Sequence, residues 1–266
     1  FFDDMENETE IIRVLYKPSD ITKDQTCMNM ISFMDDIFKV EIGDFQVVKY
    51  RILPTSPVGG LIEIVEAETL YSIYKKNQSI LNHIIDNNPD RSTKNIRDIF
   101  IKSAAAYTCF AYILGLSDRH PDNIMVTKCG KLFEIDYEFL LGMDPKKITE
   151  LRISEDMIEV MGGHCSNNFE QFKKYCSDII YDTLRKHITI IVAMLSFLPY
   201  DENQIRDFLL SKLMPGNENR HASMVFYKSL SSSYKYKIID LLHSSSKDGA
   251  LKSLDDLKNY LFSYFL

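Results

Sequence analysis

The 266-residue sequence lacks several features that define common classes of protein. It has five cysteines and no C-x-x-C pair, so we expect free thiols, no disulfide and no zinc site, as in a reducing compartment. It also lacks a basic excess, because 31 Lys and Arg against 38 Asp and Glu give a formal charge of -7. A nucleic-acid-binding face is normally basic, so nucleic acid is not an expected partner.

Long apolar runs are missing as well. The most apolar stretch, residues 187–198, is shorter than the ~18 residues that a membrane span needs, and it predicts a buried helix. The first ten residues, FFDDMENETE, are acidic where a signal peptide is basic, and no apolar core followed by small residues is present. These absences predict a cytoplasmic protein without an export signal.

The composition that is present, 45% hydrophobic and 26% charged residues, is typical of a globular protein with one large domain or two small lobes. The hydrophobic period changes near residue 66. Before it, short β-branched runs at 10–16, 45–53 and 59–65 predict strands. Between the first two, residues 23–38 place apolar side chains at helical spacing.

After residue 66 the pattern is mainly helical. The exception is residues 123–136, two short apolar runs around a Lys128-Cys129-Gly130 turn, which predict a hairpin. The pattern therefore predicts an α+β fold with a small β-rich lobe, residues 1–65, and a larger helical lobe, residues 66–266. The expected helices span residues 93–114, 167–198, 201–213, 218–231 and 254–265.

The stretch GLSDRHPDNIMV, residues 115–126, places Asp118, His120 and Asn123 in one loop between a helix and the hairpin. The far strand of the hairpin returns Asp136 to the same end. Carboxylate and amide oxygens suit Mg²⁺, and a neighbouring imidazole can take a proton from a hydroxyl. That combination is what phosphoryl transfer from a nucleotide requires.

Simpler interpretations of the same residues stand beside this one. A lone Asp-x-His is usually a capped turn, Asn123 can cap a turn, and Arg119 is expected to form a structural ion pair rather than to touch substrate. The ordered set favours catalysis, because the loop and hairpin are followed by FEIDYEFLLG and preceded, far upstream, by a strand that carries a lysine.

Residues 112–142 resemble the catalytic and metal-binding loops of the phosphatidylinositol 3- and 4-kinase superfamily, whose pattern is G-x-x-D-R-H-x-x-N followed by I-D-F-G. The similarity runs from about residue 11 to the end of the chain. Three segments, residues 24–38, 101–115 and 142–163, are most similar to the class III phosphatidylinositol 3-kinases. The resemblance implies a two-lobed, protein-kinase-like fold whose small lobe is partly truncated, because too few residues precede residue 11 for the phosphate-covering loop.

The resemblance also implies an ATP site. Lys17 matches the strand lysine that pairs with nucleotide phosphates, and Asp24 matches an acidic position of the family if one residue is deleted here. Tyr50 matches the adenine pocket, and backbone groups of Glu63 and Val65 match the hinge that hydrogen-bonds adenine. By composition alone, Lys17 is an exposed residue at a strand end and the hinge run is a buried strand.

The implied catalytic residues are the four in the loop and hairpin. Asp118 would orient the reacting groups and His120 would act as the base, while Asn123 and Asp136 would hold Mg²⁺ or Mn²⁺. The chain departs from the family pattern at IDYE, where Glu138 replaces a glycine and adds a negative charge beside the metal-binding aspartate.

Residues 142–163 match the activation loop, the segment that selects the lipid headgroup in this family. Lys146, Lys147 and Arg152 are the cations between Asp136 and Met161. Their modest charge favours unphosphorylated phosphatidylinositol over a headgroup that already carries phosphates. A solvated loop of mixed charge is the alternative for any one of them.

The resemblance implies transfer of the ATP γ-phosphate to the 3-hydroxyl of phosphatidylinositol. A regulatory protein subunit and peripheral attachment to endosomal-type membranes are implied too. The aromatic terminal stretch, residues 254–265, would either lie in the bilayer interface or dock on its own domain. The alternatives are a phosphatidylinositol 4-kinase, a related Ser/Thr protein kinase, or a pseudokinase that binds lipid or protein without turnover.

Overall fold

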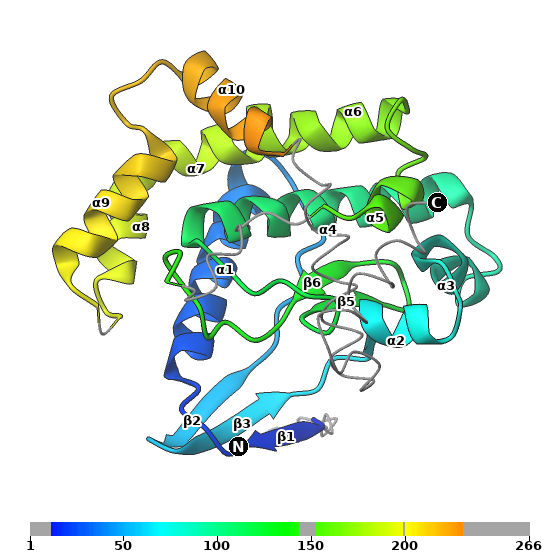
Figure 1. Ribbon diagram of the computed structural model, residues 1–266, viewed down its shortest axis with the longest axis horizontal. Coiled ribbons are helices and arrows are strands. Elements are labelled where there is room, and N and C mark those ends of the chain that lie inside the picture. The colour runs from blue at the N-terminus through cyan, green and yellow to red at the C-terminus, as the bar shows by residue number, and fades with distance from the viewer. Residues whose placement is uncertain (1–11, 144–152, 199, 231–266) are drawn as a thin grey trace, which may run out of the picture.

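The computed structural model describes residues 12–143, 153–198 and 200–230, and it has the predicted α+β, kinase-like architecture with more helix than strand (Figure 1). Two small antiparallel sheets, of order β1-β3-β2 and β4-β5-β6, lie on one side of a long central helix, α4. The predicted lobe boundary at residues 65/66 falls between β3 and β4 and stays a prediction. The predicted helix at residues 254–265 lies outside the described part of the chain.

The first sheet consists of β1 (Val14–Lys17), β2 (Ile52–Ser56) and the central strand β3 (Gly59–Glu63), with α1 (Thr22–Glu41) between β1 and β2. Strand β3 pairs with both neighbours, so that Ile62 lies opposite Leu15 of β1 and Ile52 of β2. The predicted helix over residues 23–38 is confirmed as α1, which buries the apolar face that its spacing indicated.

The predicted strand over residues 45–53 is wrong in its first part. Residues 45–51 have no regular secondary structure, and Gln46 has a positive φ of 58°. Phe45 and Val48 are nevertheless buried, because they pack into the core from an irregular segment. The Val48 carbonyl accepts a hydrogen bond of 2.5 Å from the Tyr107 hydroxyl instead of a strand partner, which satisfies it inside the core.

Helix α4 (Thr93–Leu114) has the bounds that the sequence predicts. Ser92 caps its start by accepting from the Asn95 N–H, and Gly115 ends it in the left-handed conformation. Every side chain from Ser103 to Leu114 is buried, which explains the small residues Ala104–Ala106 in its middle. The helix is the axis of the core, and its carboxyl end opens into the loop that carries Asp118.

The second sheet confirms the predicted hairpin and adds a strand that was not predicted. Strands β5 (Ile124–Thr127) and β6 (Leu132–Glu134) form the hairpin, and β4 (Ala67–Thr69) pairs with β5. Three short helices were also missed. They are α2 (Leu70–Lys75), α3 (Ile80–Asp86) and α5 (Glu155–Val160), capped by Thr69, Ser79 and Ser154.

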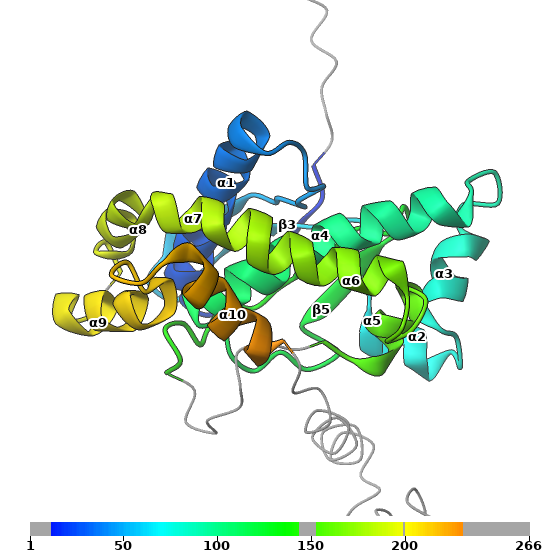
Figure 2. The same cartoon turned by 90° about the horizontal axis from the view of Figure 1, so that it is seen from above.

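The predicted continuous helix over residues 167–198 is wrong, because four elements share this range. They are α6 (Asn167–Lys174), the π-helical segment η1 (Tyr175–Tyr181), α7 (Asp182–Lys186) and α8 (Ile188–Leu195). Segments α6 and η1 pack along α4, and α10 (Asn219–Ser229) packs on η1 (Figure 2). Helix α9 (Glu202–Leu213) contacts α8 and α4. In the described ranges, no helix combines the length and the apolar character that crossing a bilayer demands.

Candidate active site

The loop between α4 and β5 positions the residues of the predicted catalytic set. Asp118 in this loop has a φ of 58°, and Asp136, which follows β6, has a φ of 63°. Positive φ angles are uncommon outside glycine, although aspartate tolerates them better than most residues. Strained backbone of this kind is concentrated at functional sites, and here it occurs at two of the four predicted catalytic residues.

Gly115 sets the direction in which this loop leaves α4. A Cβ built there would lie 2.6 Å from the Gly142 nitrogen and 2.9 Å from the Leu141 Cα, in addition to its clash with Phe208. Since main chain cannot move aside cheaply, we expect Gly115→Ala to lower the free energy of unfolding by about 3 kcal/mol. Denaturant unfolding measures the change. The matched control is Gly163→Ala, which shares a positive φ but meets nothing within 4 Å; an equal loss in both variants would contradict the clash.

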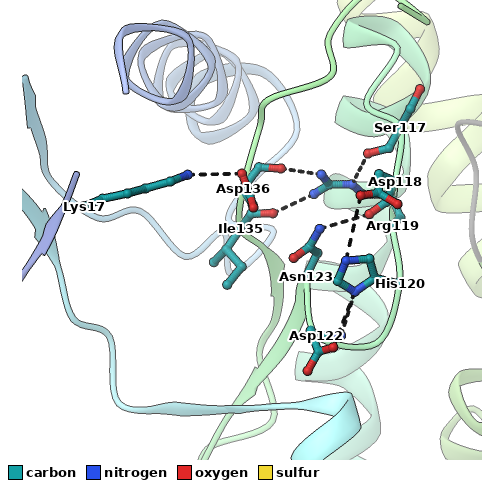
Figure 3. A network of polar contacts seen from close by, with 9 residues as sticks. All are labelled: Lys17, Ser117, Asp118, Arg119, His120, Asp122, Asn123, Ile135 and Asp136. Carbon is teal, nitrogen blue, oxygen red and sulfur yellow. Dashed lines mark hydrogen bonds and ion pairs between the residues drawn. The ribbon is translucent and has the colours of Figure 1, made fainter. Parts of the chain in front are cut away.

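Arg119 joins the loop between α4 and β5 to the strand end that carries Asp136 (Figure 3). The buried guanidinium donates through Nε to the Ser117 carbonyl at 2.9 Å, through Nη1 to the Ile135 carbonyl at 2.8 Å, and through Nη2 to the Asp136 carbonyl. It also lies 3.7 Å from Glu134 Oε2, which confirms the predicted structural ion pair. Main-chain oxygens far apart in sequence are thereby held by one rigid cation.

Asn123 and Asp118 are held against each other inside the loop. The Asn123 side chain donates through Nδ2 to the Asp118 carbonyl at 3.0 Å, and the Asn123 carbonyl accepts from the Ile135 N–H at 3.0 Å. The second bond places Asn123 beside the residue that precedes Asp136. Because Nδ2 is anchored in this way, the amide oxygen Oδ1 faces away from the Asp118 carbonyl.

His120 lies between two carboxylates of the same loop. Its Nε2 is 3.9 Å from Asp118 Oδ2, and its Nδ1 is 3.7 Å from Asp122 Oδ2. The Asp122 N–H also donates to Nδ1 at 3.2 Å. That hydrogen bond favours the tautomer whose Nδ1 carries a lone pair, whereas the Asp122 carboxylate favours the tautomer whose Nδ1 carries the proton. Only the protonated Nδ1 leaves Nε2 with a lone pair that can accept a proton from a hydroxyl.

Lys17 reaches across from β1 to two carboxylates. Its Nζ lies 3.2 Å from Asp136 Oδ1 and 3.7 Å from Asp24 Oδ2. Burial alone would lower the pKa of Lys17, but the charges of Asp24 and Asp136 outweigh it and raise the pKa above its usual value. The amine therefore stays charged.

Asp24 lies in the first turn of α1, almost fully buried. Burial raises the pKa of its carboxyl, against the Tyr137 N–H and the Lys17 charge, which lower it. The Tyr137 N–H donates to Asp24 Oδ1 at 2.9 Å. Asp24 therefore fixes the main chain next to Asp136 as well as contacting Lys17, although its sequence match required a deletion.

A cavity of about 350 Å³ opens between the first sheet and the hairpin. Six predicted site residues line it, namely Lys17, Asp24, Tyr50, Glu63, Val65 and Asp136. Its apolar walls come from Leu15, Ile62 and Ile64 on the side of the first sheet and from Met125, Phe133 and Ile135 on the side of the hairpin. An apolar slot with polar groups at one end is the usual form of a small-molecule site. The slot suits a flat aromatic base, and its polar end places the Lys17 amine beside the carboxylates of Asp24 and Asp136.

The residues present fit a divalent cation with few protein ligands. Among the described residues there is no group of three or more His, Cys, Asp or Glu side chains arranged for a metal. Mg²⁺ is commonly bound through one or two carboxylates plus waters and substrate phosphates. The hard oxygens of Asn123 and Asp136 meet this pattern, and their loops are held together by Arg119. The Lys17 amine donates to Oδ1 of Asp136 at 3.2 Å.

Three predicted site residues, Lys146, Lys147 and Arg152, lie outside the described residues. Two features of the site were not predicted. Asp122 contacts Nδ1 of His120, and the guanidinium of Arg119 binds three carbonyls. The sequence carries a signal for the first, since Asp122 lies two residues from His120 in the same polar loop.

Comparisons with known proteins agree with this arrangement. A family model described as "Phosphatidylinositol 3- and 4-kinase" matches residues 11–203. "Phosphatidylinositol 3-kinase, nodule isoform" of Glycine max is 36% identical over 187 residues, which cover 68% of this chain and 23% of that protein. "Phosphatidylinositol 3-kinase VPS34" is 34% identical over 187 residues in Arabidopsis thaliana, covering 68% and 23%. The protein of that name in Saccharomyces cerevisiae is 35% identical over 185 residues, covering 67% and 21%.

The two-sheet fold and the cavity with its lysine and carboxylates define a kinase-like protein. The chain belongs to the phosphatidylinositol 3- and 4-kinase family, because the family model covers most of its length. The match spans less than a quarter of the length of these curated relatives.

Proposed function

We propose that this chain transfers the γ-phosphate of ATP to the 3-hydroxyl of phosphatidylinositol and so forms phosphatidylinositol 3-phosphate. The observation that carries the proposal is the contact of Lys17 with Asp24 and Asp136 inside one cavity. A charged amine at the polar end of an apolar slot is placed to meet nucleotide phosphates. The names of the relatives, phosphatidylinositol 3-kinases, support the choice of acceptor and of ring position.

In this proposal the nucleotide lies along the cavity. The base occupies the apolar slot near Tyr50, with main-chain groups of Glu63 and Val65 as its hydrogen-bonding partners. Lys17 binds the phosphates at the other end. Asp24 holds the main chain at Tyr137 and keeps Lys17 charged. In this role Asp24 does not itself contact the nucleotide.

Asn123 and Asp136 would hold Mg²⁺, which supplies charge neutralisation on the transferring phosphoryl group when bound. His120 would take the proton of the inositol hydroxyl at Nε2, with the Asp122 carboxylate stabilising the proton on Nδ1. Asp118, 3.9 Å from Nε2, would orient the hydroxyl. Arg119 contacts main-chain carbonyls and does not take part in the transfer itself.

The acceptor is a membrane lipid, so the active site has to reach a bilayer surface. We propose that Lys146, Lys147 and Arg152 meet the single phosphate of the headgroup. Residues 254–265 are proposed to contact the interface. We extend the proposal to a regulatory protein subunit and to the cytoplasmic face of endosomal-type membranes, both of which the resemblance to class III phosphatidylinositol 3-kinases implies.

The test is incubation with radiolabelled ATP, Mg²⁺ and vesicles that contain phosphatidylinositol, followed by identification of the ring position that gains phosphate. We expect label at position 3. Label at position 4, or label on a Ser/Thr protein substrate and none on lipid, would replace the proposed acceptor. Vesicle binding without transfer and without nucleotide binding would instead indicate a pseudokinase. This outcome is tested because Glu138 adds a negative charge near Asp136, where the family pattern has a glycine.

A further inference from the structure

The end of β3 departs from a regular antiparallel ladder. Ile52 of β2 is paired with Ile62 of β3, so the next pair along the ladder is Arg51 with Glu63. A hydrogen-bonded pair in such a ladder exchanges two bonds, each from one N–H to the carbonyl opposite. One of them is present, because the Glu63 N–H donates to the Arg51 carbonyl at 2.9 Å.

A side chain takes the place of the second acceptor. The Arg51 N–H donates to Oε2 of Glu63 at 2.9 Å, and the Arg51 Nε lies 3.4 Å from the same oxygen. The carboxylate therefore receives the donor that a regular ladder would direct at the Glu63 carbonyl. The Glu63 side chain is 25% exposed, so this contact is partly shielded from water.

The Glu63 carbonyl points toward the side of β3 on which the cavity continues. Main-chain groups of successive strand residues alternate between the two neighbouring strands. The Ile64 N–H donates to the Arg13 carbonyl next to β1, whereas the Glu63 N–H donates toward β2. Next to Arg51 on that second side comes Tyr50, which lines the cavity together with Glu63 and Val65. A ligand whose edge lies there would occupy the next position of the ladder after Arg51.

We propose that the Glu63 side chain is a positioning residue for base selection, because it holds the Arg51 N–H and keeps the Glu63 carbonyl as an acceptor for the exocyclic amine of adenine. The inference rests on the proposed function, in which the base lies beside Glu63. A purine with no amine at position 6 leaves that carbonyl without a donor, and a site built for a hydrogen bond rejects the analogue that lacks it.

The test compares two nucleotides that differ only in that amine: ATP and purine riboside triphosphate. The dissociation constants are measured by displacement of a fluorescent nucleotide, and their ratio gives the preference for the amine. In Glu63→Ala the Arg51 N–H is expected to turn to the carbonyl, and the preference should fall about five- to tenfold, the worth of one hydrogen bond. The affinity for purine riboside triphosphate should change less than twofold.

Three further variants separate the hydrogen bond from a general loosening of the strand. Glu63→Gln keeps an acceptor oxygen at the same reach and should keep the preference. Glu63→Asp keeps the charge but is one methylene shorter, so it should lose the preference, and it serves as the second variant if Glu63→Ala folds poorly. Arg51→Ala keeps the main-chain N–H while removing the ion pair, and should keep the preference.

Each contrary result overturns the inference in a different way. Equal weakening of both nucleotides in Glu63→Ala and Glu63→Asp would show that the side chain only supports the strand. Loss of the preference in Arg51→Ala would assign it to the ion pair instead of the N–H. If the unaltered protein bound neither nucleotide, the proposed function would fail together with the inference, whereas binding without change in preference rejects the inference alone.

Discussion

Asp136→Asn is expected to reduce phosphate transfer about a thousandfold, the range that follows from removing one charge-stabilising group from a phosphoryl-transfer or oxyanion site. The carboxylate contacts Lys17 at 3.2 Å, and in the proposed function it is the only charged protein ligand of the cation. Asparagine has the same shape and also tolerates the φ of 63° at this position, so the fold should be unaffected.

The measurement is the initial rate of labelled phosphatidylinositol 3-phosphate formation at saturating ATP, repeated over a range of Mg²⁺ concentrations. The matched control is Asp207→Asn on α9, whose side chain is 73% exposed and contacts Arg206, and which should retain the full rate. A loss of less than tenfold in Asp136→Asn, with normal Mg²⁺ dependence, would exclude Asp136 as a metal ligand. It would leave the role of Lys17 unaffected.

Local sequence signals were sufficient for the long and regular elements. Helix α4 was predicted to the residue from its twenty-two residues of helical period, and the structure shows that Ser92 caps its start and Gly115 ends it. The hairpin was predicted because two short apolar runs flank a turn that ends in Gly130. In both cases the local signals lie within the element or directly beside it, so no knowledge of distant contacts was needed.

Tertiary contacts decided the elements that were predicted wrongly. Residues 45–51 have the apolar content of a strand. In the core, however, the Val48 carbonyl accepts a hydrogen bond from the Tyr107 hydroxyl and not from a neighbouring strand. The helix over residues 167–198 contains the π-helical turn at 175–181 and a break at His187. Neither is marked by proline or glycine within those segments, and His187 instead contacts Glu41 of α1 at 2.6 Å.

The candidate site divides in the same way. Asp136 could be chosen from residue type and order, and Lys17 from the resemblance to the family; the structure places both on one cavity. Residues that act on the main chain could not, because the position of a carbonyl depends on the whole fold. The three carbonyl contacts of Arg119 belong to this second group, and so does the contact of the Glu63 side chain with the Arg51 N–H. Their importance is visible only once the strands and the loop are in place.

Arg119→Ala is expected to lower the free energy of unfolding by about 4 kcal/mol, the range for removing one partner of a buried ion pair. Glu134 would lose its cationic partner while only 7% of its side chain is exposed. The carbonyls of Ser117, Ile135 and Asp136 would lose their shared donor as well. Chemical unfolding measures the loss. Adding Glu134→Leu should restore about half of it, because the buried charge is removed while the carbonyls still lack a donor.

Activity separates this role from stability alone, and Arg185 offers the matched control. Arg185 is also buried and donates to carbonyls, those of Leu213, Met214 and Asn217 in the helical layer. Arg185→Ala should therefore destabilise the protein to a similar extent and leave transfer by the folded fraction unchanged. Arg119→Ala should lose about a hundredfold in that fraction, since a displacement of about 1 Å at Asp136 has this effect. Equal activity in the two folded variants would show that the Arg119 contacts stabilise the fold without positioning Asp136.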